Sequence, residues 1–197
     1  HVVGFSSAWA YPADHTNLSE AGYWNGPMRE SVQHYGLTKK ILGGGLQAYK
    51  QQYGMSGSGL VLGSVYGPGD KSDHLIPSLI SRMIANKKRL EIRGDGNQIR
   101  DFIYISDQLE AIYIHRDSNL NLLNISGGQA FTVREVVDCL VDLMAYKGDI
   151  IYEINSAPSD DVRILDMSIA DQQTGWPHKF RLMTLREGLA LTLEKEI

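Results

Sequence analysis

The sequence predicts an α/β protein with a parallel sheet. Short apolar segments of strand length alternate along the chain with longer segments in which apolar residues recur at helical spacing. Clusters of Gly, Pro, Asn and Asp separate these segments and mark the turns. Strands that alternate with helices in this way typically form a parallel sheet that the helices cover.

The N-terminal third of the chain holds two predicted buried strands and one long helix. The apolar run that opens the chain is a strand that ends at Ser6 and Ser7, and a loop rich in Pro and Gly follows it. The turn after the second strand contains Gly-Pro-Gly. The predicted elements are a strand over 1–6, a helix over 30–53, a strand over 59–65 and a turn over 66–70.

The rest of the chain continues the alternation. Thr132 and Thr184 each stand three residues before a Glu, which is the capping-box pattern at a helix start. Ser106 is placed to cap the predicted helix over 107–116. The predicted helices cover 74–86, 107–116, the segment after Thr132, and 185–196; the predicted strands cover 89–93, 101–105, 120–125 and 149–154, with a turn at 94–97.

Three consecutive glycines, Gly43 to Gly45, lie inside the predicted helix 30–53. They cost the helix roughly 3 kcal/mol relative to alanine, so we expect them to allow close packing of the helix. They do not follow a strand and are not a phosphate-binding loop.

Composition excludes several classes of protein. The chain has 197 residues, a net charge of −4, 43% hydrophobic and 21% charged residues. It lacks the basic excess of a nucleic-acid-binding protein and has no apolar run long enough to span a membrane. Cys139, the single cysteine, lies in an apolar helical stretch and is expected to be a core thiol. A chain without a disulfide framework or a visible targeting segment suits the cytoplasm.

The chemistry-bearing residues are Ser7, Tyr35 and Lys39. Tyr35 and Lys39 stand four apart in a helix and therefore share one face. Ser7, at the end of a strand, can direct its hydroxyl to the same point. Such a trio can move a proton to or from an alcohol or ketone oxygen while a hydride moves on carbon, because a nearby ammonium stabilises a phenolate. The alternative is an amphipathic Tyr and an exposed Lys on an ordinary helix.

Several motifs occur in a fixed order along the chain. They are the strand ending at Ser6-Ser7, Tyr35-x-x-x-Lys39, Val65-Tyr66-Gly67-Pro68-Gly69-Asp70, Gly94-Asp95-Gly96 with Arg100-Asp101-Phe102, Ile105-Ser106-Asp107, Asn124-Ile125-Ser126-Gly127-Gly128, and Gly175-Trp176. Together they resemble the extended short-chain dehydrogenase/reductase family, whose members modify nucleotide-linked sugars. The resemblance covers nearly the whole chain, as the second half of the family fold.

The resemblance implies the C-terminal part of a Rossmann-type doubly wound parallel sheet plus a small α/β substrate-binding domain. Residues 1–66 and 99–125 would belong to the nucleotide-binding domain, and residues 67–98 and 126–197 to the sugar-nucleotide domain. The family's glycine-rich cofactor loop belongs to its first half. Complete members dimerise, so a homodimer is expected for a complete protein.

Within the family the chain is most similar to the GDP-fucose synthase branch, which epimerises and then reduces a 4-keto sugar with NADPH. Tyr11-Pro12, the segment His74-Leu75-Ile76-Pro77, and the tail from Tyr146 to Trp176 carry this closer resemblance.

The resemblance assigns roles to individual residues, and each has a structural alternative. Ser7 could bond to backbone, His74 could only start a helix, Arg82 could lie on a solvated helix face, and Arg100 could pair with Asp101 or Asp107. The implied catalytic residues are Ser7, Tyr35, Lys39 and His74; the implied cofactor-binding residues are Ser6, Tyr35, Lys39, Leu62, Gly63, Ser64, Val65 and His74; the implied substrate-binding residues are Ser7, Arg82, Arg93, Arg100 and Arg163.

The chain differs from the branch at residues that reduce the number of reactions it is expected to catalyse. Trp9 replaces the cysteine that serves as epimerisation base, and indole has no usable basic site. Ala8-Trp9 also replaces the Asp-Glu of the related dehydratases. Ser64 and Arg93 replace an Asn and a Trp of the branch.

We therefore expect NADPH-dependent reduction of the 4-keto group of a nucleotide-linked deoxy sugar. The alternatives are a sugar-nucleotide 4-epimerase with bound NAD, and a non-catalytic binding or assembly module that lacks the cofactor loop.

Overall fold

The computed structural model describes residues 1–154 and 162–194 and confirms the α/β prediction. The helices are α1 (Gln33–Tyr53), α2 (Leu75–Ala85), α3 (Ile105–His115), α4 (Val133–Leu143), α5 (Ser168–Thr174) and α6 (Leu185–Leu193). The strands are β1 (Val2–Ser7), β2 (Asn17–Leu18), β3 (Gly57–Leu62), β4 (Ser64–Tyr66), β5 (Arg89–Arg93), β6 (Ile99–Tyr104), β7 (Leu123–Ile125), β8 (Ala130–Thr132), β9 (Asp149–Glu153) and β10 (Val162–Leu165).

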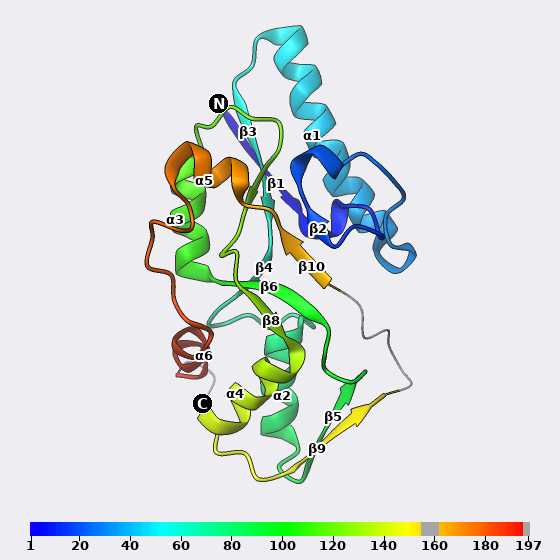
Figure 1. The fold of residues 1–197 in the computed structure, drawn as a ribbon, viewed down its shortest axis with the longest axis vertical. Helices are drawn as coiled ribbons and strands as arrows, with labels where there is room; N and C mark the ends of the chain where they lie inside the picture. Colours follow the sequence, from blue (N-terminus) through cyan, green and yellow to red (C-terminus); the bar gives the residue numbers. More distant parts are fainter. Residues whose placement is uncertain (155–161, 195–197) are drawn as a thin grey trace.

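The first sheet has the order β1-β3-β7, and both of its strand pairs are parallel. Ser7 is in register with Leu62, and Leu62 with Ile125, so the three strands end at the same edge. Figure 1 shows α1 beside this sheet on one side and α3 on the other. The packing of α1 is close, since a Cβ on Gly4 would lie 2.7 Å from Leu42 Cδ2. The carboxyl edge of this sheet positions the site described below.

The predicted continuous strand over 59–65 is wrong, because the chain changes sheets at Gly63. β3 ends at Leu62, and β4 pairs instead with β6, with Ser64 opposite Phe102. A Cβ on Gly63 would lie 2.3 Å from Ser126 Oγ and 3.1 Å from the Asp101 carbonyl oxygen. Glycine therefore permits the crossing that carries the chain from the first sheet to the second.

The second sheet has the order β2-β10-β6-β4, with β8 antiparallel to β6, and a third sheet pairs β5 with β9 in parallel. The strands predicted at 89–93 and 149–154 are confirmed as β5 and β9. β2, β8, β10 and α5 were not predicted. In Figure 1, β4 and β6 link the upper half, with β1, β3 and α1, to the lower half, with α2, α4 and β5.

Two clusters of buried apolar residues fill these halves. The upper cluster includes Tyr11, Leu60, Ile125 and Trp176, and the lower one includes Ile76, Ile92, Val136 and Leu189. Phe102 packs in the lower cluster and the neighbouring Ile103 in the upper one, so the faces of β6 contribute to both. The division into a nucleotide-binding domain and a sugar-nucleotide domain stays a prediction.

Both capping boxes are confirmed. The Thr132 and Thr184 hydroxyls accept from the backbone N–H groups of Glu135 and Glu187, whose carboxylates accept in return. The cap predicted at Ser106 is wrong, because α3 begins two residues earlier than predicted, at Ile105 after Tyr104, and Ser106 Oγ donates to Asp107 Oδ1 at 3.3 Å. The last predicted helix, 185–196, is observed as α6 to Leu193 with Glu194 as its C-cap, and residues 195 and 196 of the prediction lie outside the described residues.

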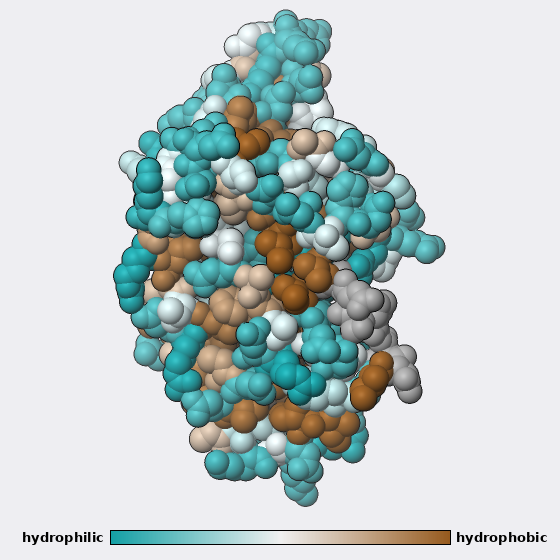
Figure 2. All heavy atoms as spheres, in the orientation of Figure 1, coloured by the Kyte–Doolittle hydropathy of each residue, from teal (hydrophilic) through white to brown (hydrophobic). Residues whose placement is uncertain are grey.

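The three-glycine segment lies inside α1 as predicted, but only Gly43 is tightly packed. A Cβ there would lie 3.0 Å from Leu122 Cδ2, whereas a Cβ on Gly45 would meet no atom within 4 Å. Cys139 is half-buried against the lower cluster. Among the described helices, none has both the length and the apolar character of a membrane span. Hydrophilic residues cover most of the face in Figure 2, with apolar residues gathered along its middle.

Candidate functional site

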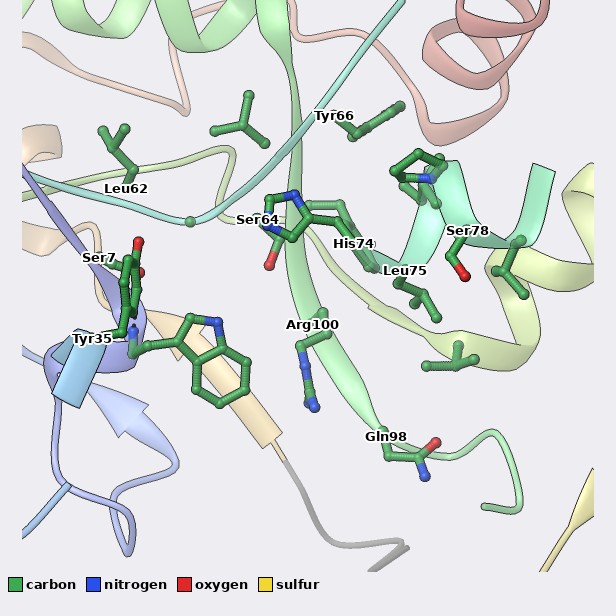
Figure 3. Close-up of a pocket in the computed structure, with 18 of the residues that line it drawn as sticks. Ser7, Tyr35, Leu62, Ser64, Tyr66, His74, Leu75, Ser78, Gln98 and Arg100 are labelled. Carbon is green, nitrogen blue, oxygen red and sulfur yellow. Dashed lines mark hydrogen bonds between the residues drawn. The ribbon is translucent and has the colours of Figure 1, made fainter. Parts of the chain in front are cut away.

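The carboxyl edge of the first sheet opens onto a cavity of about 710 Å³. Its size is in the range of sites for small-molecule ligands and cofactors. Every predicted site residue except Arg163 lines it. They are Ser6, Ser7, Tyr35, Lys39, Leu62, Gly63, Ser64, Val65, His74, Arg82, Arg93 and Arg100. Figure 3 shows Ser7 and Tyr35 at one side of the cavity and Gln98 at the other, with Arg100 between them.

Ser7 stands where β1 ends and a short 3-10 helix (Ala8–Ala10) begins. Its Oγ accepts from the backbone N–H of Trp9 at 3.3 Å, which is the helix-capping contact. A hydroxyl has two lone pairs and one proton, so this contact leaves the proton available for a substrate oxygen. The structural alternative, a backbone contact, is therefore present and is compatible with a catalytic role.

Tyr35 and Lys39 lie in the first two turns of α1. The Lys39 ammonium donates to the Phe5 carbonyl at 3.1 Å, and its Nζ is 5.7 Å from the centre of the Tyr35 ring. The bond to Phe5 fixes the ammonium at the carboxyl end of β1. Two further ammonium protons are left to donate to a ligand.

A buried contact beneath this pair fixes α1 against the sheet. Ser6 Oγ and the Tyr23 hydroxyl lie 2.7 Å apart, and each lies 3.2 Å from the Lys39 carbonyl oxygen, so one hydroxyl donates to the other, which donates to the carbonyl. Ser6 is therefore used structurally as well as lining the cavity.

His74 is the residue before α2, and most of its side chain is exposed. Its Nδ1 is 3.6 Å from Asp70 Oδ2, which orients the ring across the Gly-Pro-Gly turn. His74 therefore stands at the start of a helix, as the structural alternative expected, and its ring also lines the cavity.

The cavity wall is strongly cationic. Arg29, Arg82, Arg93, Arg100 and Lys39 line it, and among the described lining residues there is no Asp or Glu. The chain as a whole has a net charge of −4, so the positive charge is concentrated here. Guanidinium forks in a concave site favour ligands with phosphate or carboxylate groups.

Backbone contacts orient two of these arginines. Arg82 Nη2 donates to the Glu91 carbonyl oxygen, which joins α2 to β5. Arg100 Nη1 donates to the Ile99 carbonyl oxygen at 2.9 Å, and its guanidinium carbon is 5.6 Å from the centre of the Trp9 ring. Both side chains therefore have one anchored edge and still reach the cavity.

Trp9 occupies the wall beside Ser7, among three guanidinium groups. Their carbons are 5.1 Å (Arg163), 5.6 Å (Arg100) and 5.8 Å (Arg29) from its ring centre. The ring face attracts cations and holds the indole in place. The indole nitrogen can only donate a hydrogen bond, so this position supplies no base.

The structure does not place Arg163 with the other predicted substrate-binding residues in the cavity wall. Its side chain is 4% exposed and does not line the cavity. Arg163 Nη2 donates to the Ala8 carbonyl at 2.8 Å, with longer contacts to the carbonyls of Tyr11 and Pro12. The guanidinium fork is used to hold the segment that carries Trp9.

Asp101, next to Arg100 in β6, is buried beside the sheet crossing. Its carboxylate accepts from Ser126 Oγ at 2.7 Å and from the Leu165 N–H at 3.3 Å. Burial raises the pKa of Asp101 to about 7, although these two hydrogen bonds oppose the shift.

Sequence reasoning did not assign four polar residues of the cavity wall, Arg29, Tyr66, Ser78 and Gln98. Arg29 comes from the irregular loop before α1, which gave no periodic or motif signal. Gln98 lies between a recognised turn and a recognised arginine, but only the structure places its side chain in the wall.

The strand ends fit a nicotinamide cofactor. Ligands of doubly wound sheets bind outside the carboxyl ends of the strands. Here those ends carry small or uncharged residues, Ser6 and Ser7 at the end of β1 and Leu62 to Val65 from the end of β3 into β4, and the Lys39 ammonium lies beside the end of β1 through its bond to the Phe5 carbonyl. This leaves room for a planar ring with a ribose that can accept from Lys39.

Fold and site together describe an α/β protein with a Tyr-x-x-x-Lys helix at the carboxyl edge of a parallel sheet. The family model described as "NAD dependent epimerase/dehydratase family" matches residues 1–125, and the chain belongs to this family.

Curated relatives and solved structures agree with this. The chain is 30% identical over 188 residues to a GDP-L-fucose synthase of Sinorhizobium fredii, covering 90% of this chain and 58% of that protein. It is 26% identical over 185 residues to a probable GDP-L-fucose synthase of Oryza sativa subsp. japonica, covering 89% of this chain and 55% of that protein. The chain thus spans little more than half the length of these relatives.

A GDP-mannoheptose C4 reductase from Campylobacter jejuni with NADP bound has the same fold. It superposes with a TM-score of 0.81 over 98% of this chain and 67% of that chain, at 24% sequence identity.

Proposed function

We propose that this chain carries the substrate side of an NADPH-dependent ketoreductase that acts on the 4-keto group of a nucleotide-linked deoxy sugar. The observation that carries the proposal is one cavity that holds Ser7, Tyr35 and Lys39 with Trp9 in the position of a base. These residues can complete a reduction, and they lack the group that would remove a proton from carbon.

In this proposal each residue acts on the carbonyl oxygen of the substrate. The Ser7 hydroxyl donates to that oxygen and polarises the carbonyl. Tyr35 gives its proton to the oxygen as the carbon is reduced, and Lys39 stabilises the resulting phenolate. A nicotinamide cofactor, when bound, supplies the hydride. His74 lines the same wall, but without a base opposite it the acid role in epimerisation has no partner reaction.

The cationic wall supports a sugar nucleotide as the substrate. Arg82, Arg93 and Arg100 line the same cavity as Ser7 and Tyr35, and Arg100 lies between these two residues and the far side of the cavity (Figure 3), so a diphosphate that follows the sugar would meet these arginines. A guanidinium fork donates two parallel hydrogen bonds to phosphate oxygens. The relatives support the same class, since the Sinorhizobium fredii protein is a GDP-L-fucose synthase and the Campylobacter jejuni protein is a GDP-mannoheptose C4 reductase with NADP bound.

The test uses the protein expressed from its complete gene, with NADPH and a GDP-linked 4-keto-6-deoxy sugar in D₂O. We expect NADPH oxidation, a reduced sugar, and no deuterium at the carbons beside the carbonyl. Reduction with deuterium at those carbons would show that epimerisation persists and would overturn the role given to Trp9.

Other outcomes favour the alternatives. Tightly held NAD and interconversion of two sugar nucleotides without net NADPH consumption would point to a 4-epimerase. If the protein neither consumes NADPH nor binds NADPH or NAD, the result would point to a non-catalytic module.

A further inference from the structure

Gln98 has a buried amide oxygen that no group in the described part of the chain satisfies. The residue immediately precedes β6 and is 7% exposed. Its Oε1 has no hydrogen-bond partner among the described residues. The side chain nevertheless lines the cavity, as Figure 3 shows.

Hydrogen bonds to α4 hold the backbone at Gln98 in place. Its carbonyl oxygen accepts from the Val133 N–H at 3.0 Å, and the Gly96 carbonyl accepts from the Arg134 N–H at 2.9 Å. These bonds join the start of β6 to the first turn of α4. A rigid segment thus holds an unpaired acceptor in the wall of the cavity, and buried acceptors are nearly always paired.

We propose that Gln98 is a substrate-binding residue that accepts a hydrogen bond from an O–H or N–H of the nucleoside part of the substrate. This rests on the proposed function. The reacting sugar carbon must lie at Ser7 and Tyr35, and Gln98 lies across the cavity from them, beyond Arg100. A diphosphate among the arginines therefore directs the nucleoside toward Gln98.

Charge explains why a neutral acceptor matters at this end. Arg82, Arg93 and Arg100 are donors only, so they suit phosphate and carbonyl oxygens of the ligand. They cannot accept a hydrogen bond from a ribose hydroxyl or from a base N–H. Gln98 Oε1 supplies that function, and an analogue that lacks the matching donor leaves the oxygen unpaired again, which is how such sites reject analogues.

The experiment measures binding of GDP to the 197-residue chain by calorimetry, with UDP as a second probe. Gln98→Met keeps the length of the side chain and removes the acceptor. Gln108→Met is the matched control, because Gln108 is 1% exposed, has an unpaired amide in the described part of the chain, and does not line the cavity. We expect Gln98→Met to weaken GDP binding about tenfold, the amount that one lost hydrogen bond accounts for. We expect Gln108→Met to leave GDP binding unchanged.

Thermal unfolding of the ligand-free variants separates binding from structure. Removing an unpaired buried oxygen should not lower the melting temperature. Gln98→Met that melts lower and binds GDP like the wild type would overturn the inference in favour of a structural role.

Comparison of GDP with 2′-deoxy-GDP and with IDP identifies the donor. A GDP/2′-deoxy-GDP preference that disappears in Gln98→Met assigns the ribose hydroxyl, and a lost GDP/IDP preference assigns the amino group of the base. Gln98→Glu keeps acceptor oxygens and should retain the preference, so it tests the inference even where Gln98→Met folds poorly.

The two proposals fail differently. Tight GDP or UDP binding that Gln98→Met does not change overturns the role of Gln98 alone. Absence of binding by both nucleotides to wild type overturns the sugar-nucleotide proposal and the inference with it.

Discussion

The Lys39 ammonium lies 5.7 Å from the centre of the Tyr35 ring. A hydrogen bond from this ammonium to the Phe5 carbonyl, at 3.1 Å, holds it there. The helix that carries both residues is therefore linked to the end of β1, close to Ser7. The packing of α1 on the sheet then sets the distance between the ammonium and the Tyr35 ring.

Tyr35→Phe should remove the proton donor without disturbing the helix. We expect kcat for ketone reduction to fall about 100- to 10,000-fold, the usual contribution of a positioned acid. GDP binding should stay at the wild-type value, because the phenol acts on the sugar oxygen. Stopped-flow NADPH oxidation and calorimetry measure the two quantities.

Tyr49→Phe is the control for this change, since Tyr49 lies on the same helix, is 57% exposed and does not line the cavity. Its kcat should equal that of the wild type. Equal losses in both variants would assign the effect to the helix rather than to the phenol.

Gly63→Ala and Gly45→Ala should change stability in opposite directions. A Cβ at residue 63 would lie 2.3 Å from Ser126 Oγ, so we expect a loss of about 1–3 kcal/mol from overpacking. A Cβ at residue 45 would meet nothing within 4 Å inside α1, so we expect a gain of about 0.5–1 kcal/mol from helix propensity. Urea unfolding of both variants measures this, and a stabilised Gly63→Ala would contradict the close crossing.

Local signals were enough to predict the part of the site that depends on one strand and one helix. The apolar run ending at Ser7 and the helical spacing around Tyr35 and Lys39 are each set by neighbours in sequence, and the capping boxes at Thr132 and Thr184 fix helix starts by the same short-range chemistry. Elements of this kind are readable because their hydrogen bonds close within a few residues.

The remainder depends on contacts between distant segments. β2, β8 and β10 have two to four residues and exist only because partners elsewhere in the chain pair with them. The sheet crossing at Gly63 is set by Ser126 and Asp101. The buried position of Arg163 could not be predicted for the same reason, since its carbonyl partners lie near the start of the chain.

Arg163→Met should destabilise the protein although Arg163 lies outside the cavity. It would remove the 2.8 Å donor to the Ala8 carbonyl, which then keeps only the Tyr11 N–H at 3.2 Å, together with the longer buried contacts to the Tyr11 and Pro12 carbonyls, and we expect a loss of about 1–3 kcal/mol. Chemical unfolding measures the loss, and weaker fluorescence anisotropy of Trp9 in a variant without the other two tryptophans would report the loosened segment.

The control for this variant is Arg181→Met, which removes an exposed arginine that pairs with Glu187 at 2.8 Å. We expect a change within about 0.5 kcal/mol, because surface ion pairs contribute little. Equal effects in the two variants would show that Arg163 is no more important to the fold than a surface arginine.

Asp101 gives stability a pH dependence whose sign follows from its burial. The folded protein keeps this carboxyl protonated up to a pKa of about 7, whereas the ordinary value is 3.8. Between these two values the folded state holds one more proton than the unfolded state. The contribution of Asp101 is therefore fully present below the lower value and is lost as pH rises through the window, by at most about 1.4 kcal/mol per pH unit.

Asp101→Asn tests this directly, because the amide cannot ionise and can still serve both partners. Its oxygen can accept from the Leu165 N–H and its NH₂ can donate to Ser126 Oγ, the two groups that contact the carboxylate. We expect the stability of the wild type to fall relative to Asp101→Asn as pH rises from about 4 to about 7, and the difference to level off above that. Urea unfolding across this range measures both curves, and curves that stay parallel would mean that the carboxyl is already ionised in the folded protein at the lower pH.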